Sequence, residues 1–359
     1  MGDRQVTRDL REFTHDEAPW GELSVCVAGV GISGSSVVRA LHEFGARTVV
    51  VDGGDDAKAR ARAAELEALG ATVRLGDADT LPDGVDLVVT SPGWPPTSPL
   101  FAAAAKAGVP VWGDIELAWR LRPREGAAPW LAITGTNGKT TTVRMLAAIL
   151  NAAGHRAEAV GNVGTPVLDA VLARDAAGRP AYDVLAVELS SFQLHWLSRW
   201  SEAPEDQHAP HMRAAAVLNI APDHLDWHGS AEAYAADKGR IFAGAEVACV
   251  YNTADPVTEQ VVRVAEVAEG CRAVGFGLGA PGPSGFGVVE DLLVDRAFVA
   301  DTRNEAVELA HVGDVEPAAP HNVANALAAA ALARAHGVPP EAVRDGLRAF
   351  RPDPHRIAH

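Results

Sequence analysis

A stretch of small and polar residues, Thr134-Gly135-Thr136-Asn137-Gly138-Lys139-Thr140-Thr141, has the composition of a phosphate-binding loop. Backbone N–H groups of such a loop, together with the positive end of a following helix, bind anions. The ammonium of Lys139 can reach the β- and γ-phosphates of a nucleotide, and the hydroxyl of Thr140 can ligate Mg²⁺. The pattern therefore predicts a nucleoside triphosphate site. A plain strand-to-helix turn would need only the two glycines.

The segments on both sides of this loop fit the interpretation. Trp130–Ile133 is a short apolar run typical of a buried strand, and the residues after Lys139 have the amphipathic pattern of a helix. The loop departs from the usual phosphate-loop pattern in one place, because Ile133 stands where a further glycine is common. What remains, G-x-x-G-K-T between a strand and a helix, still predicts phosphate binding.

A second glycine-rich turn, Gly29-Val30-Gly31-Ile32-Ser33-Gly34, follows an apolar run near the N-terminus. A helical pattern comes next, and a second apolar run, Thr48–Val51, ends at Asp52. This arrangement is typical of a dinucleotide site, although its physics requires only that a diphosphate fits at the helix N-terminus. A nicotinamide dehydrogenase and a protein that binds a UDP-sugar therefore both remain open on the residues alone.

Two further groups of polar residues stand where buried strands are expected to end. Ser91-Pro92-Gly93 follows the apolar run Leu87–Thr90, and Glu188 ends the run Tyr182–Leu189. Open α/β sheets bind their ligands at the carboxyl ends of strands. Nucleotide-hydrolysing enzymes hold a metal with a carboxylate in this position near a phosphate loop. The alternative is that Glu188 is a solvated residue at the end of a strand.

Other candidates have ordinary explanations that the sequence leaves open. The segment Ala221–His228 contains two aspartates and two histidines, which suit metal ligation but are also common in loops. Lys238 lies on an amphipathic helical pattern, where a solvated lysine is the default interpretation. Asn322 and Asn325 share one face near the start of an alanine-rich helix, where they could simply help to begin the helix.

The composition limits the classes of partner. The chain has 359 residues, 48% of them hydrophobic, and a formal net charge of −16, which argues against nucleic acid or an anionic membrane as the main partner. Its three cysteines, Cys26, Cys249 and Cys271, have no CxxC spacing, which indicates a reducing compartment and no zinc site. A charged N-terminus and the lack of an apolar run of about 18 residues predict a cytoplasmic protein without a membrane span.

The alternation of strand and helix patterns predicts an α/β protein with mostly parallel sheets. A polar Pro/Gly-rich stretch, Arg122–Pro129, suits a linker between two units. We expect a Rossmann-like domain over residues 1–125 and a P-loop ATPase-type α/β domain over residues 126–353. Gly270–Val312 is rich in glycine and proline and predicts an antiparallel excursion, while Ser201–Met212 reads as a loop.

Eight motifs in order make the chain resemble the Mur ligase family of peptidoglycan synthesis. They run from Val25 to Arg356 and comprise GVGISG with VVVD and TSPG, GDIELAW, TGTNGKTT, GNVGTP, VELSSFQL, LNIAPDHLDWH with YAADK, HNVANALAAAA and PHR. Asn137 in the phosphate loop and the Ser-Ser-Phe-Gln-Leu after Glu188 favour the branch that adds D-glutamate over the branch that adds alanine. The resemblance favours the UDP-sugar interpretation of the N-terminal turn over the nicotinamide one.

The resemblance implies a role for each matching residue. The phosphates of ATP would be held by Lys139 and the amides around Gly135, Thr136, Asn137, Gly138, Thr140 and Thr141, with further nucleotide contacts from Asn322, Asn325 and Arg356. Two Mg²⁺ ions would be ligated by Thr140 and Glu188 and by His224 and a carbamylated Lys238. The UDP moiety would be held by Gly31, Ile32, Ser33, Gly34, Asp52, Ser91, Pro92 and Gly93, and Asn162 would contact the substrate near the metals.

The resemblance also implies the chemistry. The carboxylate of UDP-MurNAc-L-Ala attacks the γ-phosphate of ATP, and the amine of D-glutamate then displaces phosphate from the acyl phosphate. Members of the family carry a third α/β domain that holds the amino acid, and here residues 354–359 would begin the linker to it. We therefore expect a monomer that binds the UDP-substrate but ligates D-glutamate poorly. A sibling ligase that adds another amino acid and a non-catalytic nucleotide-binding module are the alternatives.

Overall fold

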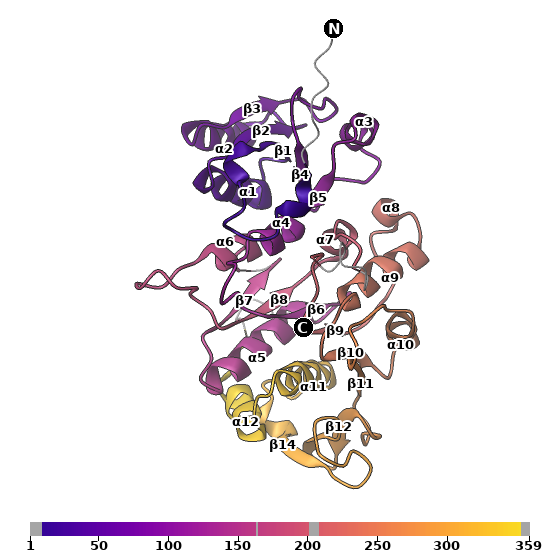
Figure 1. Ribbon diagram of the computed structural model, residues 1–359. Coiled ribbons are helices and arrows are strands. Elements are labelled where there is room, and N and C mark those ends of the chain that lie inside the picture. The colour runs from indigo at the N-terminus through magenta and orange to yellow at the C-terminus, as the bar shows by residue number, and fades with distance from the viewer. Residues whose placement is uncertain (1–8, 163, 201–207, 353–359) are drawn as a thin grey trace.

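Two β-sheets with flanking helices make up the protein. The computed structural model describes residues 9–352 except for residue 163 and residues 201–207, and it places one sheet on each side of a layer of helices that includes α4, α6 and α7 (Figure 1). Arg356 and the predicted linker at 354–359 lie outside the described residues, and so do residues 201–207 of the loop predicted at 201–212. The prediction of an α/β fold with mostly parallel sheets is confirmed.

The first sheet has five parallel strands in the order β3-β2-β1-β4-β5. Its strands are β1 (Ser24–Ala28), β2 (Arg47–Asp52), β3 (Thr72–Leu75), β4 (Leu87–Thr90) and β5 (Val111–Gly113), and its helices are α1 (Ile32–Glu43), α2 (Ala57–Ala68), α3 (Pro99–Ala107) and α4 (Asp114–Arg120). Strands β1 and β4 are buried along their whole length, as expected where helices cover both faces of a parallel sheet. The strand order reverses beside β1, so the turns after β1 and β4 open into one crevice.

The second sheet has nine strands in the order β14-β13-β12-β11-β10-β9-β6-β8-β7. Its strands are β6 (Trp130–Thr134), β7 (Ala157–Gly161), β8 (Val184–Glu188), β9 (Ala214–Val217), β10 (Ala248–Asn252), β11 (Arg272–Phe276), β12 (Gly285–Val289), β13 (Leu292–Asp295) and β14 (Val307–His311). The pairs from β7 to β12 are parallel, and β12, β13 and β14 pair in antiparallel fashion. The predicted antiparallel excursion therefore begins only after β12.

Small residues let the helices of this second unit pack closely. The helices are α5 (Lys139–Ala152), α6 (Val167–Leu172), α7 (Ser191–His195), α8 (Leu225–His228), α9 (Ala231–Gly239), α10 (Pro256–Arg263), α11 (Pro320–Ala335) and α12 (Pro340–Ala349). Both α11 and α12 pack on α5. A Cβ atom on Gly346 of α12 would lie 2.4 Å from the Cα of Ile149, so only glycine permits this approach.

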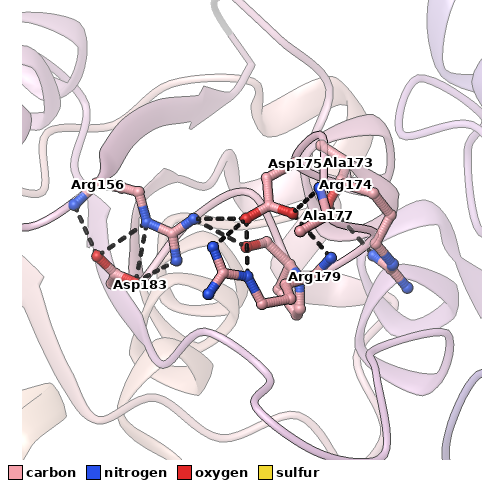
Figure 2. A network of polar contacts seen from close by, with 8 residues as sticks. Arg156, Ala173, Arg174, Asp175, Ala177, Arg179 and Asp183 are labelled. Carbon is pink, nitrogen blue, oxygen red and sulfur yellow. Dashed lines mark hydrogen bonds and ion pairs between the residues drawn. The ribbon is translucent and has the colours of Figure 1, made fainter.

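Ion pairs join the loop between α6 and β8 to Arg156, the residue before β7, at the N-terminal ends of these two strands. Arg156 Nη2 lies 2.6 Å from Asp183 Oδ1, and Arg179 Nη2 lies 2.9 Å from Asp175 Oδ2 (Figure 2). Arg156 also approaches Asp175, at 3.6 Å, and so joins the two pairs. These side chains are largely solvated and contribute little to stability individually. They lie just before β8, the strand that ends at Glu188.

The helices of the described part of the chain include none that is both long enough and apolar enough to cross a bilayer.

Candidate active site

The phosphate loop joins β6 to α5 as the sequence predicts. Gly135 has φ +159° and Gly138 has φ +85°, and Gly138 caps the N-terminus of the 14-residue helix α5. The Lys139 ammonium donates to the carbonyl oxygens of Gly135 and Thr136 at 2.9 and 3.1 Å, so the lysine lies back across the loop. The Asn137 N–H donates to Asn219 Oδ1 at 2.8 Å, which holds the loop against the end of β9. The loop therefore presents backbone donors, a cation and a helix dipole together.

Helix α11 closes one side of this loop. A Cβ atom on Gly138 would lie 2.5 Å from Asn325 Oδ1, so the buried Asn325 side chain contacts the loop directly. Asn322, one turn earlier, is also buried and donates to the carbonyl of Pro317 at 3.2 Å. Asn325 therefore lies against the phosphate loop, whereas the bond from Asn322 to Pro317 is a local contact at the start of the helix.

A threonine and a carboxylate form a buried pair at the start of α5. Thr140 Oγ1 donates to Glu188 Oε2 at 2.9 Å, and only 1% of Glu188 is exposed. Strands β8 and β6 are neighbours, with Glu188 opposite Ile133, and this pairing brings the carboxylate beside the phosphate loop. The interpretation of Glu188 as a solvated strand-end residue is therefore wrong. A hydroxyl and a carboxylate held together are an oxygen donor set that suits Mg²⁺.

Lys238 is buried, which corrects the default expectation of a solvated lysine. Only 2% of the residue is exposed, and its Nζ donates to the carbonyl of Gly135 at 3.0 Å. Burial, together with the charge of Lys139, lowers the pKa of Lys238 to about 7. The Tyr234 ring lies 4.7 Å from the ammonium. The lysine thus stands beside the phosphate loop, in a position that its helical pattern alone did not reveal.

Hydrogen bonds fix the helix that carries Lys238. The carboxylate of Asp237 accepts from His195 Nδ1 at 2.9 Å and from His228 Nδ1 at 2.8 Å. The other ring nitrogen of His228 lies 3.0 Å from Ser191 Oγ. Helices α7, α8 and α9 are therefore tied together next to Glu188 and Lys238.

His224 lies at the start of α8 with φ +51°. Its ring packs on Phe192 with centroids 4.8 Å apart, and its Nε2 lies 3.5 Å from Asp223 Oδ2. About half of the His224 side chain is exposed, unlike that of Glu188 or Lys238. Within residues 9–352, leaving out 163 and 201–207, no group of three or more His, Cys, Asp and Glu is arranged to hold a metal. The predicted Mg²⁺ ligands differ from such a group, because two of them, Thr140 and Lys238, are not of these residue types.

The N-terminal turn is built around Asp52. Its Oδ2 accepts from the Val30 N–H at 2.8 Å, and its Oδ1 accepts from the Gly54 N–H at 2.7 Å. A Cβ atom on Gly34 would lie 1.8 Å from the carbonyl oxygen of Gly29, so glycine is required where α1 crosses the turn. Ser91 Oγ, at the end of β4, is buried and lacks a hydrogen-bond partner among the described residues. An unsatisfied buried hydroxyl beside this turn fits a ligand group.

A cavity of about 270 Å³ joins the N-terminal turn to the second unit. Ser33 lines it on one side, and Gly161 and Asn162, which follow β7, line it on the other. Asp114 and Gln193 also line the cavity, and sequence analysis did not single out either of them. Both belong to motifs quoted for the family resemblance, GDIELAW and VELSSFQL, which was the signal available.

Gly161 lies so close to β8 that its side chain must be absent. A Cβ atom would lie 2.1 Å from the carbonyl oxygen of Glu188, and φ at Gly161 is +124°. We expect Gly161→Ala to destabilise the protein by about 3 kcal/mol, because backbone clash adds to backbone strain. Gly178→Ala is the matched control, since Gly178 has φ +77° but open space around it, and it should cost about 1 kcal/mol. Equal losses in denaturant melts would contradict the proposed contact.

Two family models match the chain. The Mur ligase middle domain matches residues 133–333, and the Mur ligase MurD-like N-terminal domain matches residues 23–113. Among solved structures, the UDP-N-acetylmuramate:L-alanyl-gamma-D-glutamyl-meso-diaminopimelate ligase from Neisseria meningitides has a TM-score of 0.57 at 20% identity, covering 92% of this chain and 99% of that one. This similarity concerns the fold.

Curated relatives are far more similar in sequence. The UDP-N-acetylmuramoylalanine--D-glutamate ligase of Streptomyces avermitilis is 67% identical over 342 residues, which cover 95% of this chain and 69% of that protein. The protein of the same name from Thermobifida fusca is 59% identical, covering 93% of this chain and 68% of its own. The chain thus spans about two thirds of the length of these relatives. It belongs to the Mur ligase family, the ATP-dependent ligases of peptidoglycan synthesis.

Proposed function

We propose that this chain binds the nucleotide-linked substrate and ATP for a ligase that joins D-glutamate to UDP-N-acetylmuramoylalanine. The observation that carries the proposal is the cavity between the two units, because it extends from Ser33 to Gly161 and Asn162, and Gly161 lies against the backbone of Glu188. A diphosphate at the turn and a carboxylate near the phosphate loop would be the two ends of one substrate. The names of the relatives supply the identity of that substrate.

In this proposal residues 1–125 hold the UDP moiety. The helix α1 directs its N-terminus and the amides of Gly31, Ile32, Ser33 and Gly34 at the diphosphate. Asp52 and Ser91 would contact the nucleoside, with Pro92 and Gly93 beside them. Asp52 also accepts hydrogen bonds from backbone N–H groups. The unpartnered hydroxyl of Ser91 is the observation that supports a ligand here.

Residues 126–353 would hold ATP. Lys139 exchanges its carbonyl partners for phosphate oxygens, and the loop from Gly135 to Thr141 donates its amides. Asn325 lies against the loop, which supports a contact with the nucleotide. Thr140 and Glu188 would ligate Mg²⁺, and bound Mg²⁺ neutralises charge on the transferring phosphoryl group. His224 and Lys238 would ligate a second ion, and Asn162 would touch the substrate carboxyl end.

For Lys238 to ligate a cation, its amine must become anionic. A buried amine whose pKa lies near 7 is partly neutral at physiological pH, and a neutral amine adds CO₂ to give a carbamate and one proton. We therefore propose that Lys238 is carbamylated. The carbamate would place two oxygens where the ammonium now lies beside Gly135.

Carbamylation can be tested directly, since the chain has only four lysines, Lys58, Lys106, Lys139 and Lys238. In the presence of ¹³C-bicarbonate we expect a carbamate resonance from Lys238 in the ¹³C NMR spectrum, distinct from that of the N-terminal amine. Lys238→Ala should abolish the Lys238 resonance. The exposed Lys58 provides the control, and Lys58→Ala should leave the signal unchanged. Survival of this resonance in Lys238→Ala would contradict the assignment.

The substrate is tested by comparing affinities for a graded series of UDP ligands in calorimetry. We expect UDP-N-acetylmuramoylalanine to bind more tightly than UDP-N-acetylmuramate, which lacks the alanine, and more tightly than a UDP-N-acetylmuramoyl dipeptide. Preference for either of the others would favour a sibling ligase. Equal binding of every UDP-sugar would favour a nucleotide-binding module without this specificity. ADP release with D-glutamate against L-glutamate then tests the amino acid.

A further inference from the structure

Asp114 is the sole charged residue among those that line the cavity between the two units in the described part of the chain. It stands directly after β5, and its Oδ2 accepts from Gln193 Nε2 at 3.3 Å. Its Oδ1 accepts from the Ile115 N–H at 3.1 Å, and the Ser33 hydroxyl also bonds to the carboxyl. Asp114 therefore contacts residues of both units at the point where a ligand would pass from one to the other.

Most of the acceptor capacity of the Asp114 carboxyl is used within the protein, since the N–H of Asp114 also bonds to it. The residue nevertheless lines the cavity, where a donor on a ligand can approach it. Burial raises the pKa of Asp114 to about 6, while the bonds from Gln193, Ser33 and Ile115 act in the opposite direction. A desolvated carboxylate gains from a further charge-assisted hydrogen bond when a ligand brings a donor to it.

Charge selects which part of the substrate can lie here. On the proposed function, the diphosphate lies at the α1 N-terminus and the reacting carboxylate lies near Lys139, and both groups are anionic. Asp114 would be a third anionic group between them, and its charge would repel the diphosphate or the reacting carboxylate if either moved into the cavity. The amino sugar that connects them is neutral and carries hydroxyl and amide N–H donors, which an acidic acceptor attracts.

We propose that Asp114 is the residue that recognises the amino sugar of the substrate, by accepting a hydrogen bond from one of its hydroxyl or amide donors. The inference rests on the proposed function, since it takes the ligand to be a UDP-linked amino sugar. It assigns Asp114 a contact with the substrate beyond its bonds to Ser33 and Gln193. It also sets the direction of the ligand, because the neutral sugar alone can lie beside the carboxylate.

The test compares two ligands that differ in whether they reach Asp114. UDP ends at the Ser33 turn, whereas UDP-N-acetylmuramoylalanine extends through the cavity. We expect Asp114→Asn to weaken binding of the full substrate about tenfold or more, the value of one hydrogen bond to a charged group. Affinity for UDP should change less than about twofold, because UDP does not extend to Asp114 and therefore loses no hydrogen bond in the variant. Asp114→Ala serves as a second variant if asparagine disturbs the fold.

Asp169→Asn is the matched control. Asp169 on α6 bonds to Ser36 Oγ and lies 3.6 Å from Arg39, so it also joins the two units, but it does not line the cavity. This variant should leave the affinity ratio of the two ligands unchanged. Equal loss of UDP and full substrate in the Asp114 variants would overturn the proposal and leave Asp114 a purely structural tie. Unchanged affinity for both would overturn it as well.

Failure of the proposed function gives a different result. If the unsubstituted chain binds neither UDP nor the full substrate, the function itself is wrong. If it binds both with no variant effect, only the role of Asp114 is wrong.

Discussion

Lys139→Ala is expected to weaken ATP binding in the presence of Mg²⁺ by at least about 30-fold, because one or two charge-assisted hydrogen bonds to phosphate are lost. The same ammonium bonds two carbonyls of its own loop, Gly135 and Thr136. We expect it to turn from these carbonyls to phosphate oxygens when a nucleotide binds at the loop. Calorimetric titration with a non-hydrolysable ATP analogue measures the effect.

The control is Lys58→Ala, since Lys58 is an exposed lysine on α2 of the other unit. It should leave ATP affinity unchanged. UDP affinity should be unchanged in both variants, because the Gly29–Gly34 turn, which we propose binds UDP, follows a strand of the first sheet. Equal affinity for the ATP analogue in Lys139→Ala and the unsubstituted chain would mean that the loop does not hold the nucleotide.

Glu188→Gln is expected to weaken the dependence of ATP binding on Mg²⁺. The unsubstituted chain should bind the analogue at least about tenfold more tightly with Mg²⁺ than with EDTA, since a charge-assisted contact is worth more than 1.4 kcal/mol. In the variant the ratio should fall, because the ion at Thr140 loses its carboxylate ligand while the second ion keeps its own. The amide oxygen can still accept from Thr140 Oγ1, so folding is retained. Neutralising a buried carboxylate also lowers its desolvation cost.

Glu158→Gln is the matched control for the metal. Glu158 lies on β7, next to β8, and is only partly buried, opposite Leu185 in the strand register. Its replacement should preserve the Mg²⁺ dependence. An unchanged ratio in Glu188→Gln would show that the metal is held elsewhere.

Local patterns predicted the elements that carry the site. The apolar run before Gly135 became β6, and the pattern after Lys139 became α5, because a strand-turn-helix motif is specified by neighbouring residues. The glycines of both turns have local reasons, since Gly29, Gly135 and Gly138 have positive φ and a Cβ atom on Gly34 would clash with the backbone of Gly29.

Burial of charged side chains could not be predicted in this way. Lys238 has the pattern of a solvated helical residue, and its burial follows from the packing of α9 beside the end of β6, more than one hundred residues earlier in the chain. Asp114 and Gln193 meet across 79 positions of sequence. No periodicity records contacts of this length, so the cavity between the units became visible only in the structure.

We propose that the Gly29–Gly34 turn and the phosphate loop bind the two partners of a single reaction, with the cavity between the two units holding the substrate that connects them. Calorimetric titration of the chain with UDP-N-acetylmuramoylalanine, in the presence of Mg²⁺ and a saturating non-hydrolysable ATP analogue, tests it most directly. We predict one substrate bound per chain, displaced by UDP, with the ATP analogue retained. Tight binding of NADH with no binding of the UDP ligand, or mutually exclusive binding of the substrate and the ATP analogue, would contradict the account.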